Sequence, residues 1–318
     1  MLIVTISACG PDSFLDRRGL YTDNGMTARV RLYVDWSKSD GIVPTGMTTM
    51  LFDTKGNVKE DASNNVTEKK LQLAENTYRL LLFNLTPSEF GSLTFSNTDS
   101  YDSLRINLAR LHSHQNKDWD KGVVYMQEPE PLAIATDTIN ITMSMVDKSN
   151  TDSTTEYPFY EYPQSIISKL IIKVKVKGLT NSASVEGSID GMSDGYYPTQ
   201  WHATSTTGTH LLDSWTTSRD STNSKDGFIT TTISTFGLPY YNAGNTLTLH
   251  FSLRDGKTTK TYTYNVSDLF QYSSPRSLYL TLDDGPTLPD VTDNNHSSSG
   301  FDAEVNPWED GSNTDVNF

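Results

Sequence analysis

The fold of this 318-residue chain is decided by the stretch IISKLIIKVKVK at residues 166–177. Apolar side chains at positions 170, 172, 174 and 176 alternate with lysines at 169, 173, 175 and 177. A period of two is the repeat of a β-strand that buries one face and exposes the other. The sequence therefore predicts a strand here, which Gly178 ends.

The same alternation recurs along both halves of the chain, and helical periodicity is nearly absent. For segment 103–114 the sequence allows either one short helix or an irregular strand. The other predicted strands are 28–36, 47–52, 66–73, 78–83 and 139–146 in the first half, and 183–189, 227–235, 246–254, 258–266 and 277–283 in the second. We therefore expect an all-β fold of two tandem antiparallel β-sandwiches.

Turn chemistry supports this fold at one clear point. Asp255 and Gly256 stand between two predicted strands, and Asp-Gly tolerates the positive φ angles of a type I′ turn. The sequence therefore predicts a β-hairpin at residues 253–257.

The domain boundary is expected near residue 156. Residues 147–155 contain no apolar side chain, and an aromatic and proline-rich stretch, YPFYEYP, follows at 157–163. The predicted organisation is a lipoprotein signal remnant at 1–9, a tether at 10–27, β-sandwiches at 28–155 and 156–285, and an acidic tail at 286–318 that is either a docking strand or a free segment.

Composition limits the classes of partner. The formal net charge is −14 and the isoelectric point is near 4.8, so the overall field repels nucleic acid and anionic lipid surfaces. The chain has one cysteine, which cannot form an internal disulfide or a thiolate metal site. No apolar run is long enough to span a membrane.

That cysteine, Cys9, ends the run Ile6-Ser7-Ala8-Cys9, which matches a bacterial lipoprotein cleavage and acylation site. The polar residues Gly10 to Ser13 that follow favour a flexible tether. The eight residues before Cys9 are too short for a signal peptide, so either the natural start lies upstream or Cys9 is a buried free cysteine of an ordinary strand. We expect lipidation of Cys9 and, through it, a tether to the bacterial cell envelope.

Catalytic and metal-binding motifs are sparse. His112 and His114 would share one side of a strand but lack a third ligand nearby. Glu128 and Glu130 would suit a glycosidase only if carboxylates faced each other across a cleft, and a proline-ordered loop is the alternative. We expect no enzyme activity, no metal and no cofactor. Asp220, Asn223 and Asp226 carry oxygen ligands for calcium, but Lys225 interrupts them, which favours a polar hairpin loop.

Two sets of residues, one aromatic and one apolar, suggest binding. Trp201, Trp215, Tyr240 and Tyr241 either form a sugar-stacking platform or serve as half-buried strand residues. In the tail, five apolar side chains stand among acids and would suit a strand added to an open sheet edge: Phe301, Val305, Trp308, Val316 and Phe318.

Several motifs in order resemble the fimbrillin-like lipoproteins of Bacteroidales, close to the FimB-type fimbrial anchor group. Each motif is a plain strand signature, so the resemblance rests on their order along nearly the whole chain. They are the lipobox cysteine, DRR at 16–18, VRLYVDWS at 30–37, LIIKVKVKGL at 170–179, SIDGM at 188–192, TFGL at 235–238, LTLHFSLRDG at 247–256 and GFDAEVNPWED at 300–310.

The resemblance implies two tandem transthyretin-like domains, outer-membrane lipidation, and assembly with fimbrillin partners by edge-strand exchange in cell-surface adhesion. In that family an arginine-directed protease trims stalk and tip subunits in the loop after the first strand. Loop 37–46 of this chain contains no arginine, which suits an anchor that keeps its first strand. The alternatives are a solitary glycan-binding surface lipoprotein and, third, a hydrolase.

Overall fold

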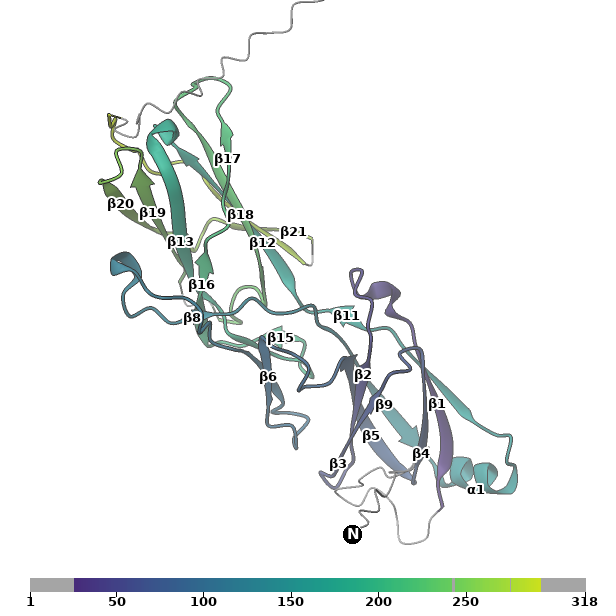
Figure 1. The fold of residues 1–318 in the computed structure, drawn as a ribbon. Coiled ribbons are helices and arrows are strands. Elements are labelled where there is room, and N and C mark those ends of the chain that lie inside the picture. The colour runs from purple at the N-terminus through teal and green to yellow at the C-terminus, as the bar shows by residue number, and fades with distance from the viewer. Residues whose placement is uncertain (1–25, 242–243, 275, 293–318) are drawn as a thin grey trace, which may run out of the picture.

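A computed structural model describes residues 26–241, 244–274 and 276–292 as an elongated molecule built almost entirely of strands (Figure 1). Five sheets are present in these residues, which we name A to E. Sheets A and B enclose one hydrophobic core, and sheets D and E enclose another. The all-β class is confirmed, and none of the described helices is long and apolar enough to cross a membrane.

The first pair of sheets comes mainly from the first half of the chain. Sheet A has the order β10 (Tyr157–Glu161), β1 (Ala28–Val34), β4 (Glu68–Leu73). Sheet B has the order β11 (Gln164–Ser165), β9 (Ala133–Ile141), β5 (Asn76–Asn84), β2 (Met47–Phe52), β3 (Val58–Ser63). Val30 and Leu32 of β1 face Leu80 and Leu82 of β5 in the core between them.

The second pair of sheets is built around the stretch that opened the sequence analysis. Sheet E has the order β17 (Thr216–Arg219), β18 (Gly227–Thr235), β12 (Ser168–Val176), β22 (Ser277–Leu282), β21 (Phe270–Ser274). Sheet D has the order β20 (Thr259–Asn265), β19 (Thr246–Leu253), β13 (Ser182–Ser193), β16 (Thr207–Leu212), β8 (Tyr125–Met126). The even-numbered apolar residues of β12 lie in the core, as the alternation predicts.

A third layer joins the two pairs of sheets. Sheet C has the order β15 (His202–Ala203), β14 (Gly195–Tyr197), β7 (Arg105–Leu108), β6 (Leu93–Ser96). It covers the second face of sheet B, so Met50 and Phe83 point into a core shared with Tyr196 and Phe236 from the second half. Because sheet B is covered on both faces, all six residues of β2 are buried.

The expected division at residue 155/156 needs correction. Strand β10 pairs with β1, and β11 pairs with β9, so residues 157–165 complete the first pair of sheets. In the opposite direction, β8 of the first half pairs with β16 of the second. Strand pairing therefore crosses the proposed boundary in both directions.

The sandwiches are also not purely antiparallel. Three pairs of strands run parallel: β1 with β10, β12 with β22, and β16 with β8. Parallel neighbours need long crossover connections, and all three pairs join segments far apart in the sequence. Alternation within a strand reports which face is buried and carries no information on the direction of its neighbour.

Segment 139–146 was expected to be a strand and is only partly one. Strand β9 ends at Ile141, and Thr142 caps helix α1 (Met143–Thr151) by accepting a hydrogen bond from the Met145 amide. Segment 103–114 contains the short strand β7, which selects the strand alternative. The predicted hairpin is present between β19 and β20, but Gly256 is its only residue with positive φ, which excludes a type I′ turn.

Candidate functional site

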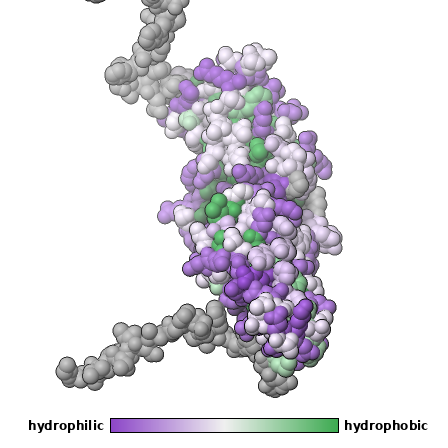
Figure 2. All heavy atoms as spheres, turned by 90° about the vertical axis from the view of Figure 1, so that its right-hand side faces the viewer, coloured by the Kyte–Doolittle hydropathy of each residue, from purple (hydrophilic) through white to green (hydrophobic). Residues whose placement is uncertain are grey.

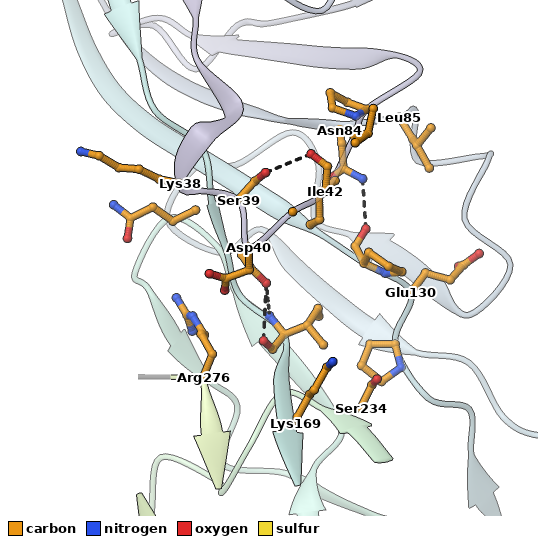
Figure 3. Close-up of a pocket in the computed structure, with 18 of the residues that line it drawn as sticks. Lys38, Ser39, Asp40, Ile42, Asn84, Leu85, Glu130, Lys169, Ser234 and Arg276 are labelled. Atoms are coloured by element: carbon orange, nitrogen blue, oxygen red, sulfur yellow. Dashed lines mark hydrogen bonds between the residues drawn. The ribbon is translucent and has the colours of Figure 1, made fainter. Parts of the chain in front are cut away.

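A cleft of about 1010 Å³ lies where the two pairs of sheets meet (Figure 3). Its upper wall is the loop after β1, residues 38–45. Asn84, Leu85 and segment 129–131 come from the first half, whereas Lys169, Ser234 and Arg276 come from sheet E or its connections. The cleft is therefore shared between both halves of the chain.

The loop after β1 has a defined shape. The Ser39 hydroxyl is buried and donates to the carbonyls of Trp36, at 2.6 Å, and Ile42, at 3.1 Å. Asp40 and Gly41 both have positive φ, a conformation that Asp and Gly tolerate better than most residues. The turn leaves the Val43 side chain 87% exposed. An apolar side chain is thus presented to solvent beside the cleft.

The inner wall is fixed by a buried amide. Asn84 is 3% exposed; its side chain donates to the Pro131 carbonyl at 3.0 Å and accepts from the Ala133 amide at 2.8 Å. The Thr48 hydroxyl holds the carbonyl of the next residue, Leu85, at 2.7 Å. These bonds satisfy backbone groups where β5 ends and the chain leaves sheet B.

Glu128 and Glu130 tie the segment between β8 and β9 to its surroundings. Glu130 lines the cleft, and its Oε2 accepts from the Ser92 amide and hydroxyl at 2.8 and 3.0 Å. Glu128 Oε2 accepts from the Ser234 amide at 2.7 Å. One oxygen of each carboxylate is therefore committed to backbone anchoring, as expected for an ordered loop. Asp40 is the other acid that lines the cleft.

Basic side chains enter the cleft from the second pair of sheets. Lys169 and Arg276 extend toward the loop that carries Asp40 (Figure 3). Lys38, on the opposite wall, has its ammonium group 4.8 Å from the centre of the Tyr162 ring. The cleft can therefore hold polar or anionic groups, and its lining includes no aromatic side chain.

The two histidines of the first half have separate environments. His114 Nε2 lies 2.7 Å from Asp120 Oδ2, and the Tyr125 hydroxyl donates to the same oxygen at 3.0 Å, whereas His112 is exposed. Among the described residues, no group of three or more His, Cys, Asp or Glu side chains is placed to hold a metal ion.

The segment around these histidines docks on the second half. Trp119 stacks on His250 of β19, with ring centres 5.3 Å apart, and Lys117 pairs with Glu186 of β13. These contacts were missed in the sequence because they join segments far apart in the chain.

The loop that carries Asp220, Asn223 and Asp226 connects β17 to β18. Asp220 Oδ1 accepts from the Thr222 amide and hydroxyl, and its Oδ2 lies 3.4 Å from Lys175 Nζ. Asp226 accepts from the Gly178 amide and the Asn223 side chain. The carboxylates are used to shape the turn, in agreement with the hairpin alternative.

The two tryptophans predicted for sugar stacking lie apart. Trp201 has φ of +58°, and its indole N–H donates to Thr136 of β9 at 2.8 Å. Together with Thr199, which donates to the Tyr101 carbonyl, it fastens the β14–β15 turn to the first half. Trp215 packs against the core between sheets D and E and donates to the Leu212 carbonyl at 2.9 Å.

The two tyrosines are brought together at the surface. Tyr240 and Tyr241 are 59% and 70% exposed, and their ring centres lie 4.9 Å apart in an edge-to-face arrangement. His202 lies 4.4 Å from Tyr240 and 5.4 Å from Tyr197. These four residues form what we call the tyrosine cluster. The sequence did not identify His202 as a member, because the cluster depends on the β14–β15 turn.

Cys9 and the five tail residues Phe301, Val305, Trp308, Val316 and Phe318 lie outside the described residues. The face of the molecule that Figure 2 shows is mostly hydrophilic or neutral, with small hydrophobic patches.

Comparison with known proteins gives one family and a fold. The family model described as "Domain of unknown function (DUF5119)" matches residues 16–213, more than half of the chain. No curated protein matches the chain. A candidate adhesin from Bacteroides ovatus has 16% identity and a TM-score of 0.61, with 85% of this chain and 96% of that one covered. The fimbrial anchor protein Mfa2 from Porphyromonas gingivalis has 10% identity and a TM-score of 0.48, with 80% and 90% covered.

Proposed function

We propose that this chain, which belongs to the DUF5119 family, is a structural subunit or membrane anchor of a surface fimbria, without enzyme activity. The likeness to the Bacteroides ovatus candidate adhesin, which spans both pairs of sheets, supports this proposal, as does the resemblance to fimbrillin-like lipoproteins. We further propose that both sandwiches are transthyretin-like and that the anchor is of the FimB type.

The observation that carries the proposal is the position of β1. It is the central strand of sheet A, parallel to β10 on one side and antiparallel to β4 on the other. Its four core-facing residues, Ala28, Val30, Leu32 and Val34, are buried. Removal of β1 would leave an apolar groove with free backbone groups on both sides, which a donor strand could fill.

We propose that this chain keeps β1. Loop 37–46 lacks arginine, so an arginine-directed protease has no substrate bond between β1 and β2. A chain that keeps its first strand cannot accept a donor there, and it would end a fibre. Lipidation at Cys9 would leave 19 residues before Ala28, a reach of at most about 60 Å from the outer membrane.

The test is reversible crosslinking in native outer membranes, followed by purification of the protein and identification of captured subunits. We expect the full chain to capture fimbrillin-like partners, and a chain that ends after Thr292 to capture none. This end point keeps Leu288, which is 3% exposed in the core, and the Thr287 carbonyl, which accepts from the Tyr262 hydroxyl at 2.7 Å. Recovery of no fimbrillin-like partner with the full chain would refute the fibre role.

The second candidate function is glycan binding by a solitary surface lipoprotein, and the exposed tyrosine cluster favours it. Aromatic rings that face solvent can stack on sugar rings. Tyr240→Ala and Tyr241→Ala should then abolish binding on a glycan array, whereas Tyr160→Ala, at an exposed tyrosine of β10, should leave it intact. Equal binding by all three variants would refute this candidate.

A further inference from the structure

The outer face of sheet E carries a row of lysines. Lys169, Lys173, Lys175 and Lys177 alternate with the buried residues of β12 and its continuation, so all four point away from the core. Strand β12 is the central strand of its sheet, between β18 and β22. The lysine row therefore runs along the middle of a solvent-facing sheet, in a chain whose net charge is −14.

Little of this charge is neutralised within the described residues. Lys175 pairs with Asp220 at 3.4 Å, and no ion pair is found there for Lys169, Lys173 or Lys177. Acids stand at both ends of the row. Asp226 accepts from the Gly178 amide beside Lys177, and Asp283 follows β22. At the other end Asp40 lines the same cleft as Lys169, and Glu128 binds the Ser234 amide. Like charges on one face of a strand repel one another, so this row favours an anionic partner.

The chain leaves the second sandwich beside the last lysine of the row. The Lys177 amide donates to the Pro286 carbonyl at 2.9 Å, and the Lys177 carbonyl accepts from the Leu288 amide at 2.9 Å. Asp290 then contacts Lys225 at 3.8 Å, in the same β17–β18 loop whose Asp220 pairs with Lys175. The described part of the chain therefore ends near one end of the row.

The sequence of that segment complements the row. It contains six acidic residues and no lysine or arginine, and four of the acids, Asp302, Glu304, Glu309 and Asp310, fall within nine positions. From Lys169 to Lys177 the strand spans about 26 Å, and residues 302–310 span a similar length when extended. Residues 293–301 are long enough to return the chain from its exit to the row.

We propose that the acidic segment 293–318 docks on the lysine row of its own chain. The tail is tethered beside its binding surface, so docking needs no second molecule. The docked tail would neutralise the row and compete with any use of the tail by another subunit. This inference does not depend on the fimbrial role.

The test is zero-length carbodiimide crosslinking of the full chain, which joins carboxylates to lysines in contact, followed by mass spectrometry. Equal amounts of ¹⁴N- and ¹⁵N-labelled protein are mixed first, so that crosslinks within a chain and between chains differ in mass. We expect crosslinks from residues 302–310 to Lys169, Lys173 or Lys177 within one chain, at least about fivefold above those to Lys257 and Lys260 of the β19–β20 hairpin. They should weaken in about 0.5 M salt, which shortens the Debye length to about 4 Å.

Two variants complete the design. Lys173→Glu with Lys177→Glu leaves the row without net charge and keeps the Lys175–Asp220 pair in place. The second variant carries Asp302→Asn, Glu304→Gln, Glu309→Gln and Asp310→Asn, which removes four of the six acids of the tail. Of the two that remain, Asp293 and Asp315, the distal Asp315 reports residual docking. The first variant should lose the crosslinks to Lys169, which it retains, with an unchanged circular dichroism spectrum. The second should lose the crosslinks from Asp315 to the row. Three outcomes would overturn the proposal. The row crosslinks could be absent, they could be no more abundant than those to Lys257 and Lys260, or they could form mainly between chains.

Discussion

Glu161 is the most unusual ionisable residue of the first sandwich. It is 5% exposed on β10, and its Oε1 has no hydrogen-bond partner. Burial, together with the nearby Asp137 carboxylate, raises the pKa of Glu161 to about 8. The folded state therefore holds this proton well above the pH at which the unfolded chain, with a pKa near 4.5, releases it.

This difference makes stability fall with rising pH. The contribution of Glu161 is fully present below about pH 4.5 and is lost as the pH rises through about 8. Glu161→Gln should raise the free energy of unfolding at pH 9 by about 3 kcal/mol and have little effect near pH 5. Urea titrations at both values measure this. The matched control is Glu60→Gln on exposed β3; a similar gain from it at pH 9 would disprove the role of burial.

His210 has the opposite dependence. It is buried on β16, neither ring nitrogen has a hydrogen-bond partner, and burial lowers its pKa to about 4. The folded state keeps the imidazole neutral. The contribution of His210 to stability is therefore fully present above about pH 6.5 and is lost as the pH falls through about 4. The acid limb of the stability curve should therefore include this residue.

Between pH 7 and pH 4.5, the free energy of unfolding should fall by about 2 kcal/mol less in His210→Leu than in the natural protein. Thermal unfolding followed across this range gives the comparison. His112→Gln, at an exposed histidine, should follow the natural curve. If His210→Leu also followed it, protonation of His210 would not contribute to acid unfolding.

At the scale of elements, the β19–β20 hairpin depends on one glycine. Gly256 has φ of +69°, and its amide donates to the Leu253 carbonyl at 3.1 Å, while Asp255 Oδ1 accepts from the Lys257 and Thr258 amides. Gly256→Ala should lower stability by about 1 kcal/mol, because a side chain disfavours this φ. Gly91→Ala, where φ is not positive and an added Cβ meets only the Glu130 side chain at 3.8 Å, should change stability less in the same melting experiment. Equal losses would argue against backbone strain.

Elements with strong alternation could be predicted, and elements defined by their partners could not. Strands β2 and β18 match their predicted ranges, since each has a regular apolar face or a fully buried run. Helix α1 was missed because Met143, Met145 and Val146 continue the apolar pattern of β9 and one capping bond at Thr142 decides the change. Sugar-stacking positions show the same limit: the sequence identifies Trp201 and Trp215 as aromatic but does not show that their indole groups bind protein carbonyl and hydroxyl oxygens.

At the scale of the whole molecule, the sequence suggested only one strand of sheet C, as one of two alternatives for segment 103–114. The strands of this sheet have two to four residues, and β7 pairs with β14 across about ninety positions. Short strands carry too few alternating residues to be detected, and their pairing depends on the packing of Phe83 and Tyr196 in a shared core. The prediction of two separate tandem domains therefore omitted the layer that joins them.

That layer should make the two halves unfold together. Arg105 of β7 donates to Asp194 Oδ1 at 2.8 Å and to the Thr206 hydroxyl at 2.8 Å, and Asp194 also accepts from Thr204 and Thr206. Asp194→Ala would leave the partly buried Arg105 guanidinium without its carboxylate, and we expect a loss of about 2 kcal/mol in the coupling between the halves.

Hydrogen exchange in rising urea should then show β5 and β12 losing protection at different urea concentrations, whereas they lose it together in the natural protein. Asp213→Ala, at an exposed acid of the second half that contacts Ser214, is the control. Loss of protection at one common concentration in Asp194→Ala would show that the shared hydrophobic core couples the halves without this ion pair.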